Sequence, residues 1–486
     1  MPACSACTGE WFASPQVVKQ DGADSLQPPG PMPWPIIGNT HLLPKVKPWY
    51  YFEQLSKDLR SPVITFWIGR NPTVWINDAQ SASELLEKKA AIYSSRPRMV
   101  VFAELTDMQQ SSDPNAKVPG TNLVTMFYGE RWRVHRKLTH QGVGLQQVRR
   151  YRGFQNDESK LIAYDILRSP EQYVAHYERY AASVVSIIGF NRRVSSIEDP
   201  IITEVIAVMQ KAAELNVPGK EFPMLFETFP WMARLSPSLF PWIFKGLGRR
   251  RRGRDFFYAL AKEAHEKDPD QSCYVNDLFK EQPKYNLRNQ EIASLAGNLF
   301  GAGSDTSSST LITFTLACCA FPEVLPRVWE ELDRVVGPHR SPSWEDEPEL
   351  LYTKAFVREV FRWRSVAIIG GQPHAPISDD KWNGYFIPKG TWTQGNVWSI
   401  HHNEKDFPNP DRFNPDRYMK DSPDARPFPN EKGYMTFGWG RRVCSGQGLA
   451  EQGTFITVAR MLWAFNIQKA LDEQGKEIPV DIFSYS

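Results

Sequence analysis

The sequence has few cysteines, almost no net charge and no long apolar run. Its 486 residues include six cysteines at irregular spacing, which is typical of a reducing compartment and argues against a disulfide-stabilised scaffold. Lys plus Arg number 57 and Asp plus Glu number 55, so the basic excess that phosphate contacts require is missing. No stretch of about 18 apolar residues predicts a membrane-spanning helix. The N-terminus also lacks the pattern of a signal peptide. These absences disfavour nucleic-acid binders, secreted proteins and integral membrane proteins.

Several common catalytic motifs are absent as well. The sequence contains no Walker motif, no Gly-x-Ser-x-Gly elbow and no His-Glu-x-x-His pair. No Gly-x-Gly-x-x-Gly follows a predicted strand, so no flavin or nicotinamide domain is expected within the chain. Electrons for any redox reaction would therefore come from a separate protein.

The composition predicts one large, mainly α domain with a minor β part. Apolar residues make up 41% and charged residues 23%, which permits a substantial core, and 38 prolines indicate many loops. We expect a polar, irregular tail over 1–27 and a folded body over 28–486. Strands are predicted as a hairpin over 62–68 and 73–76, split by 69–72, and as strand-like pieces over 373–392 with Asn383-Gly384 as a turn. Helices are predicted over 79–91, 172–190, 200–215, 255–267, 289–320, 323–336, 350–364 and 447–464.

Three local features have ordinary structural explanations. Cys4-x-x-Cys7 has metal or redox spacing, but no second pair accompanies it, so a tail is the simpler reading. Cys318 and Cys319 lie in an apolar run and are predicted to pack in the core. The run from Arg249 to Arg254 is typical of a solvated helix end or loop, with contact to anionic lipid or a partner as the alternative.

The segment from Phe437 to Gly446, Phe-Gly-Trp-Gly-Arg-Arg-Val-Cys-Ser-Gly, carries the sharpest chemical signal. Cys444 lies just before a predicted helix, where free N–H groups and the helix dipole stabilise a thiolate. Gly440 and Gly446 permit tight turns and close approach of a flat ligand. Arg442 can pair with an anionic group on that ligand. These are the requirements of a thiolate that ligates haem iron, although a buried structural cysteine in a Gly-rich turn remains the alternative.

A second signal lies inside the long helix predicted over 289–320. Ala302-Gly-Ser-Asp-Thr306 places Gly303, Asp305 and Thr306 mid-helix, where such residues are unfavourable. Such local conflict is expected where function overrides stability, and an acid beside an alcohol can relay protons. The structural alternative is a helix-packing contact, which Gly297-x-x-x-Gly301 would support.

The segment over 437–446 resembles the haem-binding signature of the cytochrome P450 superfamily at every fixed position. The resemblance runs from about Pro28 to Ser486 and implies a single cytochrome P450 fold. It implies haem b with Cys444 as axial iron ligand, and O2 as co-substrate. Electrons would come from NADPH through NADPH-cytochrome P450 reductase, with cytochrome b5 as a further donor. Residues expected to contact the cofactor by this resemblance are Trp132, Arg136, His374, Phe437, Arg442 and Gly446.

The same resemblance assigns roles to two further groups. Thr306 would hold the hydrogen-bond network at bound dioxygen, and Asp305 would help feed protons to it. Glu359-x-x-Arg362, which alone reads as a common i,i+3 ion pair, would form a structural triad with Arg417 that locks the cysteine loop. Trp132-x-x-x-Arg136, which alone reads as an ordinary basic amphipathic helix, would contact the haem propionates.

The resemblance implies a monooxygenase that hydroxylates or otherwise oxidises a small apolar organic substrate. In its local sequence, the chain most resembles filamentous-fungal enzymes of secondary metabolism. Alternatives are oxidative coupling or rearrangement, or a catalytically impaired truncated paralogue. Relatives are expected on the cytosolic face of the endoplasmic reticulum; with no transmembrane segment before the Pro-rich hinge, a peripheral or cytoplasmic location is expected here. The C-terminal β-hairpin of relatives is expected to be missing after Tyr485.

Overall fold

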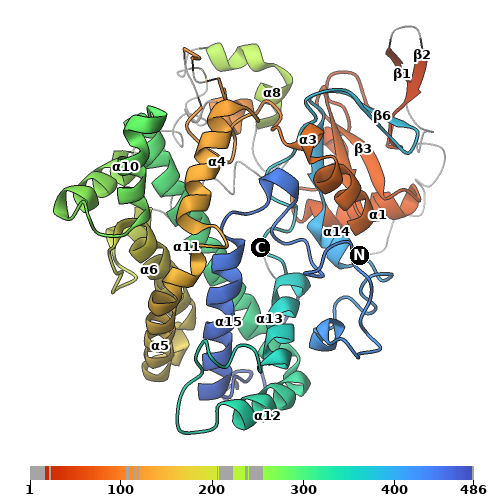
Figure 1. Cartoon of the computed structure of the whole chain (residues 1–486). Coiled ribbons are helices and arrows are strands. Elements are labelled where there is room, and N and C mark those ends of the chain that lie inside the picture. The colour runs from red at the N-terminus through yellow and green to blue at the C-terminus, as the bar shows by residue number, and fades with distance from the viewer. Residues whose placement is uncertain are drawn as a thin grey trace.

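The computed structural model describes residues 17–20, 23–104, 110–113, 115–117, 120–204, 206, 223–235, 239 and 255–483. Cys4, Cys7, the Arg run over 249–254 and most of the helix predicted over 200–215 lie outside these residues. Within them, helices form the bulk of the molecule and a small β part lies at one side (Figure 1). The mainly α prediction with a minor β part is therefore confirmed.

The helices follow the predicted periodicity closely. Residues 255–267 are also helical. The named helices are α1 (Pro48–Asp58), α2 (Ala79–Ala82), α3 (Ala90–Tyr93), α4 (Glu130–Val143), α5 (Arg152–Arg168), α6 (Tyr173–Phe190), α8 (Pro223–Thr228), α10 (Tyr274–Tyr285), α11 (Asn289–Ala320), α12 (Leu325–Val335), α13 (Leu351–Trp363), α14 (Val397–His401) and α15 (Gln447–Ala464). α11 and α15 have the predicted bounds. The helix predicted over 79–91 is interrupted, because a wider π-helical turn, Ser83–Lys88, separates α2 from α3.

Within the described ranges, the strands form three small sheets. They are β1 (Val17–Gln20), β2 (Ala23–Leu26), β3 (Val63–Ile68), β4 (Asn71–Ile76), β5 (Asp380–Trp382), β6 (Tyr385–Ile387) and β7 (Trp392–Gly395). β3 and β7 flank β4, antiparallel and parallel respectively, while β1 pairs with β2 and β5 with β6, both antiparallel. The predicted turn at Asn383-Gly384 is confirmed, since both residues have positive φ, as a two-residue hairpin turn of this kind requires.

Two strand predictions need correction. Residues 17–20 and 23–26 are not irregular, because they form the antiparallel pair β1 and β2. The β-branched Val17 and Val18 favour a strand, whereas their polar neighbours do not. The β3–β4 turn is also shorter than predicted, and Pro72 lies within β4. On the side of β4 that faces β7, the pairing covers only Thr73–Ile76. Pro72 lies outside this pairing, so its lack of a backbone N–H costs no hydrogen bond to β7.

α11 organises the hydrophobic interior. It runs between α6 and α15 in the helical part and packs against both (Figure 1). Its residues contribute to two apolar clusters, one with α5, α12, α13 and α15 and one with α4, α6 and α10. Cys318 is fully buried in the first cluster, as predicted, whereas Cys319 is half-buried. The β part has its own cluster, in which Met435 and Trp439 from the segment before α15 pack against β3, β4 and α14.

Membrane-spanning potential is low among the described helices. No single one is long and apolar enough to cross a bilayer, although α11 taken with Pro322–Val335 passes the same length and composition test across a 91° bend.

The contact between β7 and the cysteine-bearing segment predicts a sensitive position. A Cβ added at Gly395 would overlap the buried indole of Trp439. Gly395→Ala should therefore lower the free energy of unfolding by about 1–3 kcal/mol, as overpacking does. Urea unfolding checks this, with Gly153→Ala in α5 as the control. Nothing surrounds a Cβ at Gly153, so that change should stabilise by about 0.5 kcal/mol. Equal effects of the two changes would contradict the packing argument.

Candidate active site

The turn before α15 holds Cys444 in a conformation that depends on glycine. Gly438 and Gly440 have φ of +76° and +54°, in the left-handed region that favours glycine. A Cβ on Gly440 would also overlap the carbonyl oxygen of Leu86. The backbone N–H of Cys444 donates to the carbonyl of Phe437 at 2.8 Å, which closes the turn. Cys444 is thereby placed three residues before the first residue of α15.

The side chain of Cys444 is accessible. Desolvation by the surrounding protein is the largest influence on its thiol and raises its pKa. The backbone N–H groups of Gly446 and Gln447 and the charge of Arg136 act in the opposite direction and favour the thiolate. A bound cation at the sulfur would complete that shift, because metal binding deprotonates a thiol.

Arg136 of α4 forms hydrogen bonds to the residues on either side of Cys444. Its guanidinium donates to the Ser445 hydroxyl at 2.6 Å and to the Val443 carbonyl. The residues immediately before and after Cys444 are therefore tied to α4. The family resemblance implies Arg136 as a propionate contact. The structure shows that Arg136 also holds the backbone of the cysteine turn.

Three cations surround this turn, of which Arg96 is buried and Arg136 and Arg442 are half-buried. Arg442 donates to the carbonyls of Ser94, Leu123 and Met126. Arg96, which the sequence analysis missed, donates to the carbonyls of Val124, Gln372 and Pro373. Burial lowers the pKa of Arg96 to about 9, and the nearby charge of Arg136 contributes. Among the described residues, no carboxylate forms an ion pair with Arg96, Arg136 or Arg442.

His374 lies in the same neighbourhood, close enough to Arg96 and Arg442 for their charges to act on it. Its Nδ1 is 2.8 Å from the Tyr93 carbonyl, so this nitrogen carries the proton and donates. Burial lowers the pKa of His374 to about 3, with further contributions from Arg96 and Arg442. The ring is therefore neutral, and it adds a hydrogen-bonding group rather than a fourth positive charge.

Trp132 presents an unpaired donor beside these cations. The residue is 4% exposed, and its Nε1 has no hydrogen-bond partner in the described part of the chain. Arg442 lies over its ring at 4.4 Å. A buried N–H without an acceptor is costly, and buried arginines without a carboxylate are costlier. An anionic group bound here would satisfy both, so the residues present fit the carboxylates of a haem.

The middle of α11 includes accessible residues between buried neighbours. Ala302, Asp305 and Thr306 are exposed and share one helix face, whereas Phe300, Gly301 and Ser308 are buried. The Thr306 hydroxyl donates to the Ala302 carbonyl at 2.6 Å. Burial by surrounding protein raises the pKa of Asp305, which favours its protonated form. The predicted acid and alcohol therefore border accessible space from a central helix.

Gly303 explains part of the small-residue pattern in α11. A Cβ there would overlap the side chain of Val185 in α6, so this glycine serves helix packing. Within the Ala302–Thr306 segment, the helix-packing explanation therefore applies to Gly303, and the proton-relay hypothesis concerns Asp305 and Thr306.

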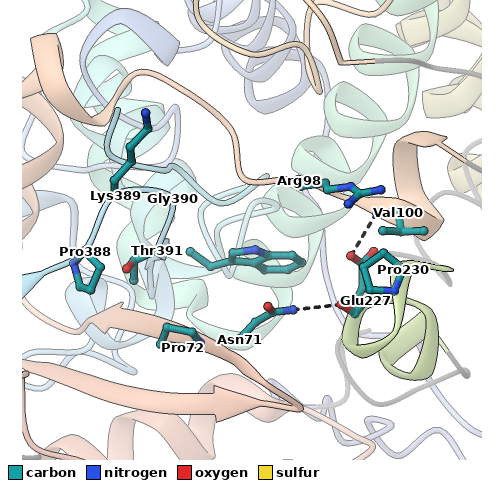
Figure 2. A pocket seen from close by; sticks show the side chains of 11 residues that line it. Asn71, Pro72, Arg98, Val100, Glu227, Pro230, Pro388, Lys389, Gly390 and Thr391 are labelled. Carbon is teal, nitrogen blue, oxygen red and sulfur yellow. Dashed lines mark hydrogen bonds between the residues drawn. The ribbon is translucent and has the colours of Figure 1, made fainter. Parts of the chain in front are cut away.

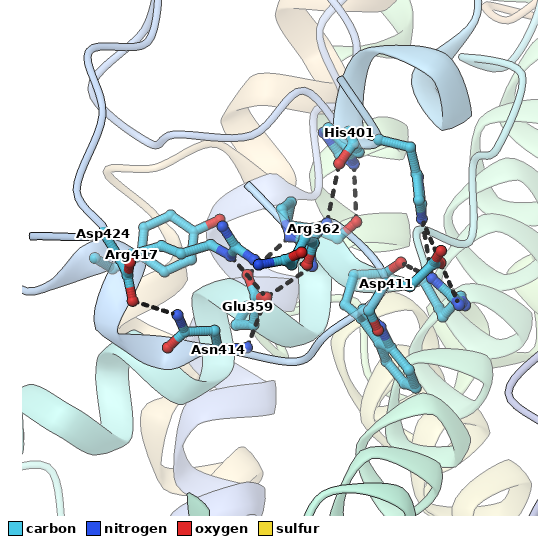
Figure 3. Close-up of polar contacts among 12 residues, drawn as sticks. Glu359, Arg362, His401, Asp411, Asn414, Arg417 and Asp424 are labelled. Atoms are coloured by element: carbon cyan, nitrogen blue, oxygen red, sulfur yellow. Dashed lines mark hydrogen bonds and ion pairs between the residues drawn. The ribbon is translucent and has the colours of Figure 1, made fainter. Parts of the chain in front are cut away.

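The predicted triad is assembled and buried. Glu359 and Arg362 of α13 form a two-pronged pair at 2.8 and 2.7 Å, and both side chains are fully buried (Figure 3). Arg417 Nε lies 3.5 Å from Glu359 Oε1, which is an ion-pair distance without a hydrogen bond. Arg417 is held mainly by the carbonyls of Pro408 and Asn409.

His401 connects this triad to the cysteine turn. Arg362 donates to the His401 carbonyl at 2.9 Å (Figure 3). The His401 Nε2 accepts the Met435 N–H at 2.8 Å, so its Nδ1 carries the proton and donates to the Arg362 carbonyl. The Thr436 hydroxyl donates to the Phe361 carbonyl. The backbone entering the turn is therefore fixed to α13 immediately before Phe437.

Phe437 and Gly446 occupy the two ends of the turn. The centroid of the Phe437 ring lies 5.3 Å from that of Phe361 and 6.2 Å from that of Tyr434. Phe437 therefore packs the turn against Phe361 of α13. Gly446 contributes a backbone N–H to the sulfur of Cys444.

A separate cavity of about 390 Å³ lies between the β part and α8 (Figure 2). Glu227 stands at one wall, where its carboxylate accepts the N–H groups of Val100 and Val101 at 3.0 Å each. Asn71 donates to the Glu227 carbonyl. Burial raises the pKa of Glu227 to about 7, against the lowering effects of these N–H groups and Arg98, while Glu104 raises it further.

The buried pair predicts a large effect of one neutral substitution. Glu359→Gln leaves Arg362 buried without its counter-charge, and the free energy of unfolding should fall by roughly 3 kcal/mol or more. Glu323→Gln is the control, because Glu323 is 51% exposed and 3.9 Å from Arg412, so its effect should stay below about 0.5 kcal/mol. Chemical denaturation of both variants measures this. A small effect at Glu359 would contradict the role given to the triad.

Glu227 predicts a pH dependence of stability. Its pKa is raised on folding, so between about pH 4.5 and 7 the folded chain holds more protons than the unfolded chain. Stability should therefore decrease as pH rises through this window. Glu227→Gln should remove that part of the slope, which urea unfolding at several pH values measures. Identical slopes for the variant and the unmodified chain would show that Glu227 keeps an ordinary pKa.

Comparison with known proteins agrees with this geometry. The sequence model of the family described as Cytochrome P450 matches residues 28–482. Similar proteins include Cytochrome P450 monooxygenase 58 of Postia placenta, 32% identical over 93% of this chain and 84% of the relative. Cytochrome P450 monooxygenase verL of Clonostachys rogersoniana is 32% identical, over 92% and 82%. Cytochrome P450 monooxygenase yanC of Aspergillus niger is 33% identical, over 93% and 84%. The chain belongs to the cytochrome P450 monooxygenase family.

Proposed function

We propose that this chain is a haem-thiolate monooxygenase in which Cys444 is the axial ligand of haem b. Its substrate would be a small apolar organic molecule of fungal secondary metabolism. The observation that carries the proposal is the accessible Cys444 thiol beside buried Arg96 and half-buried Arg136 and Arg442. These cations have no carboxylate partner among the described residues.

The chain's own residues would bind and orient the cofactor. The N–H groups of Gly446 and Gln447 point at the sulfur and tune its electron donation. Trp132 Nε1, the arginines and His374 would hold the propionates, with Arg136 also securing the turn. The bound haem would supply the activation of O2, since that chemistry belongs to the cofactor.

Asp305 and Thr306 would handle protons. Burial raises the pKa of Asp305, which favours the protonated carboxyl that a proton donor needs. The Thr306 hydroxyl donates to the Ala302 carbonyl, and its oxygen remains free to accept a proton-bearing partner. The acid and the alcohol are adjacent on one exposed face of α11, which is the arrangement a short relay needs.

Electrons would come from NADPH through NADPH-cytochrome P450 reductase, with cytochrome b5 as a second donor. The sequence has no nicotinamide-binding motif that would replace such a partner. We place this reaction at the cytosolic face of the endoplasmic reticulum, as the family resemblance implies.

Replacing the sulfur tests the proposal. Cys444→Ala should abolish stoichiometric haem incorporation, because the iron loses its protein ligand. Cys319→Ala is the matched control, since that half-buried thiol lies 3.5 Å from the Gln468 carbonyl and far along the chain from the turn. Absorption spectra of the purified variants measure the outcome. Retained haem with an unchanged Soret band in Cys444→Ala would refute the ligand assignment.

Labelled dioxygen then tests the reaction class. With reductase, NADPH and an oxidised substrate, one labelled oxygen atom should appear in the product. Unlabelled product would indicate coupling or rearrangement, and NADPH consumption that no substrate stimulates would indicate an impaired chain.

A further inference from the structure

A buried charge cluster ties α4 to the start of α11, away from the cysteine turn. Glu291, fully buried in the first turn of α11, accepts two hydrogen bonds of 2.6 Å from Arg131 and lies 2.8 Å from His135 Nε2. The Arg288 N–H donates to the same carboxylate at 3.0 Å. Arg131 also donates to the carbonyls of Tyr285 and Asn286 at the end of α10. One carboxylate therefore joins α4, α10 and α11.

The histidine of this cluster is neutral and has one fixed orientation. Burial lowers the pKa of His135, so its Nε2–H donates to Glu291. Its Nδ1 is buried and has no hydrogen-bond partner in the described part of the chain. The ring thus depends on Glu291 for its polar contact. Arg131 at 2.6 Å and the Arg288 side chain at 3.0 Å supply the positive charge that balances the carboxylate.

The spacing on α4 gives this cluster a geometric consequence. Arg131 and His135 are four residues apart and share one face, and Trp132 and Arg136 share the face one residue further on. One residue corresponds to a rotation of about 100° about the helix axis. Because Glu291 contacts both residues of the first pair, it fixes the rotation of α4. That rotation sets where the second pair points.

We propose that Glu291 is a positioning residue for the cofactor site, which it orients through Arg131 and His135 by fixing the rotation of α4. The proposal rests on the proposed function, because Trp132 and Arg136 are the residues that would meet the propionates. Glu291 itself contacts neither the cysteine turn nor any of the three unbalanced arginines in the hydrogen bonds and ion pairs of the described residues.

A matched pair of variants separates positioning from simple loss of stability. Glu291→Gln keeps the shape of the side chain and removes its charge. Glu158→Gln does the same at an equally buried carboxylate, which pairs with Arg179 at 3.0 Å and Arg193 at 2.7 Å and has no partner on α4. Both variants should unfold at lower urea concentration. Only Glu291→Gln should also shift the haem reduction potential and the propionate bending modes in resonance Raman spectra, and weaken haem retention by roughly tenfold.

His135→Leu provides a milder variant in case Glu291→Gln does not fold. It leaves the Arg131–Glu291 pair intact, so no charge is stranded, and it should shift the same spectroscopic signals in the same direction by less. The inference is overturned if Glu291→Gln, or failing that His135→Leu, leaves the potential and the propionate modes as Glu158→Gln does. If the unmodified chain binds no haem, the proposed function fails instead, so the two failures are distinguishable.

Discussion

The buried pair of Glu359 and Arg362 is the interaction on which the presentation of Cys444 depends. Neither side chain reaches solvent, and the carboxylate also accepts the N–H of Asn414. A buried ion pair adds little net stability, because desolvation offsets most of the attraction, but it strongly penalises arrangements in which one partner is lost. Here Arg362 donates to the His401 carbonyl, and His401 accepts the N–H of Met435, two residues before Phe437. The position of the buried pair therefore determines the position of the backbone that enters the turn. The pair therefore selects one position for the turn.

Charge balance distinguishes the scaffold from the site. At Glu359 and at Glu291, buried arginines meet carboxylates at 2.6 to 2.8 Å. Around Cys444, the buried Arg96 and the half-buried Arg136 and Arg442 donate to carbonyl and hydroxyl oxygens instead. The indole N–H of Trp132 has no acceptor among the described residues. Neutral acceptors leave positive charge uncompensated in a poorly solvated place. The chain thus concentrates in one neighbourhood the electrostatic cost that an anionic, thiolate-ligated group would relieve.

Sequence reasoning succeeded where the signal is local. The bounds of α11 and α15, the Asn383-Gly384 turn and the Glu359–Arg362 spacing all follow from contacts between near neighbours in the chain. It failed where a role arises from distant partners. Arg96 bonds to a carbonyl 276 residues away, and His401 accepts from an N–H 34 residues away, so neither carries a local pattern. The pairing of β1 with β2 was missed because two valines favour a strand over too few residues to outweigh their polar neighbours.

The carbon monoxide difference spectrum of the reduced, purified chain tests the central claim most directly, because it reports folding, haem content and axial ligand together. The account predicts the strongly red-shifted Soret band of a thiolate-ligated haem. A colourless protein obtained despite ample porphyrin supply, or a band typical of a neutral thiol or histidine ligand, would contradict it.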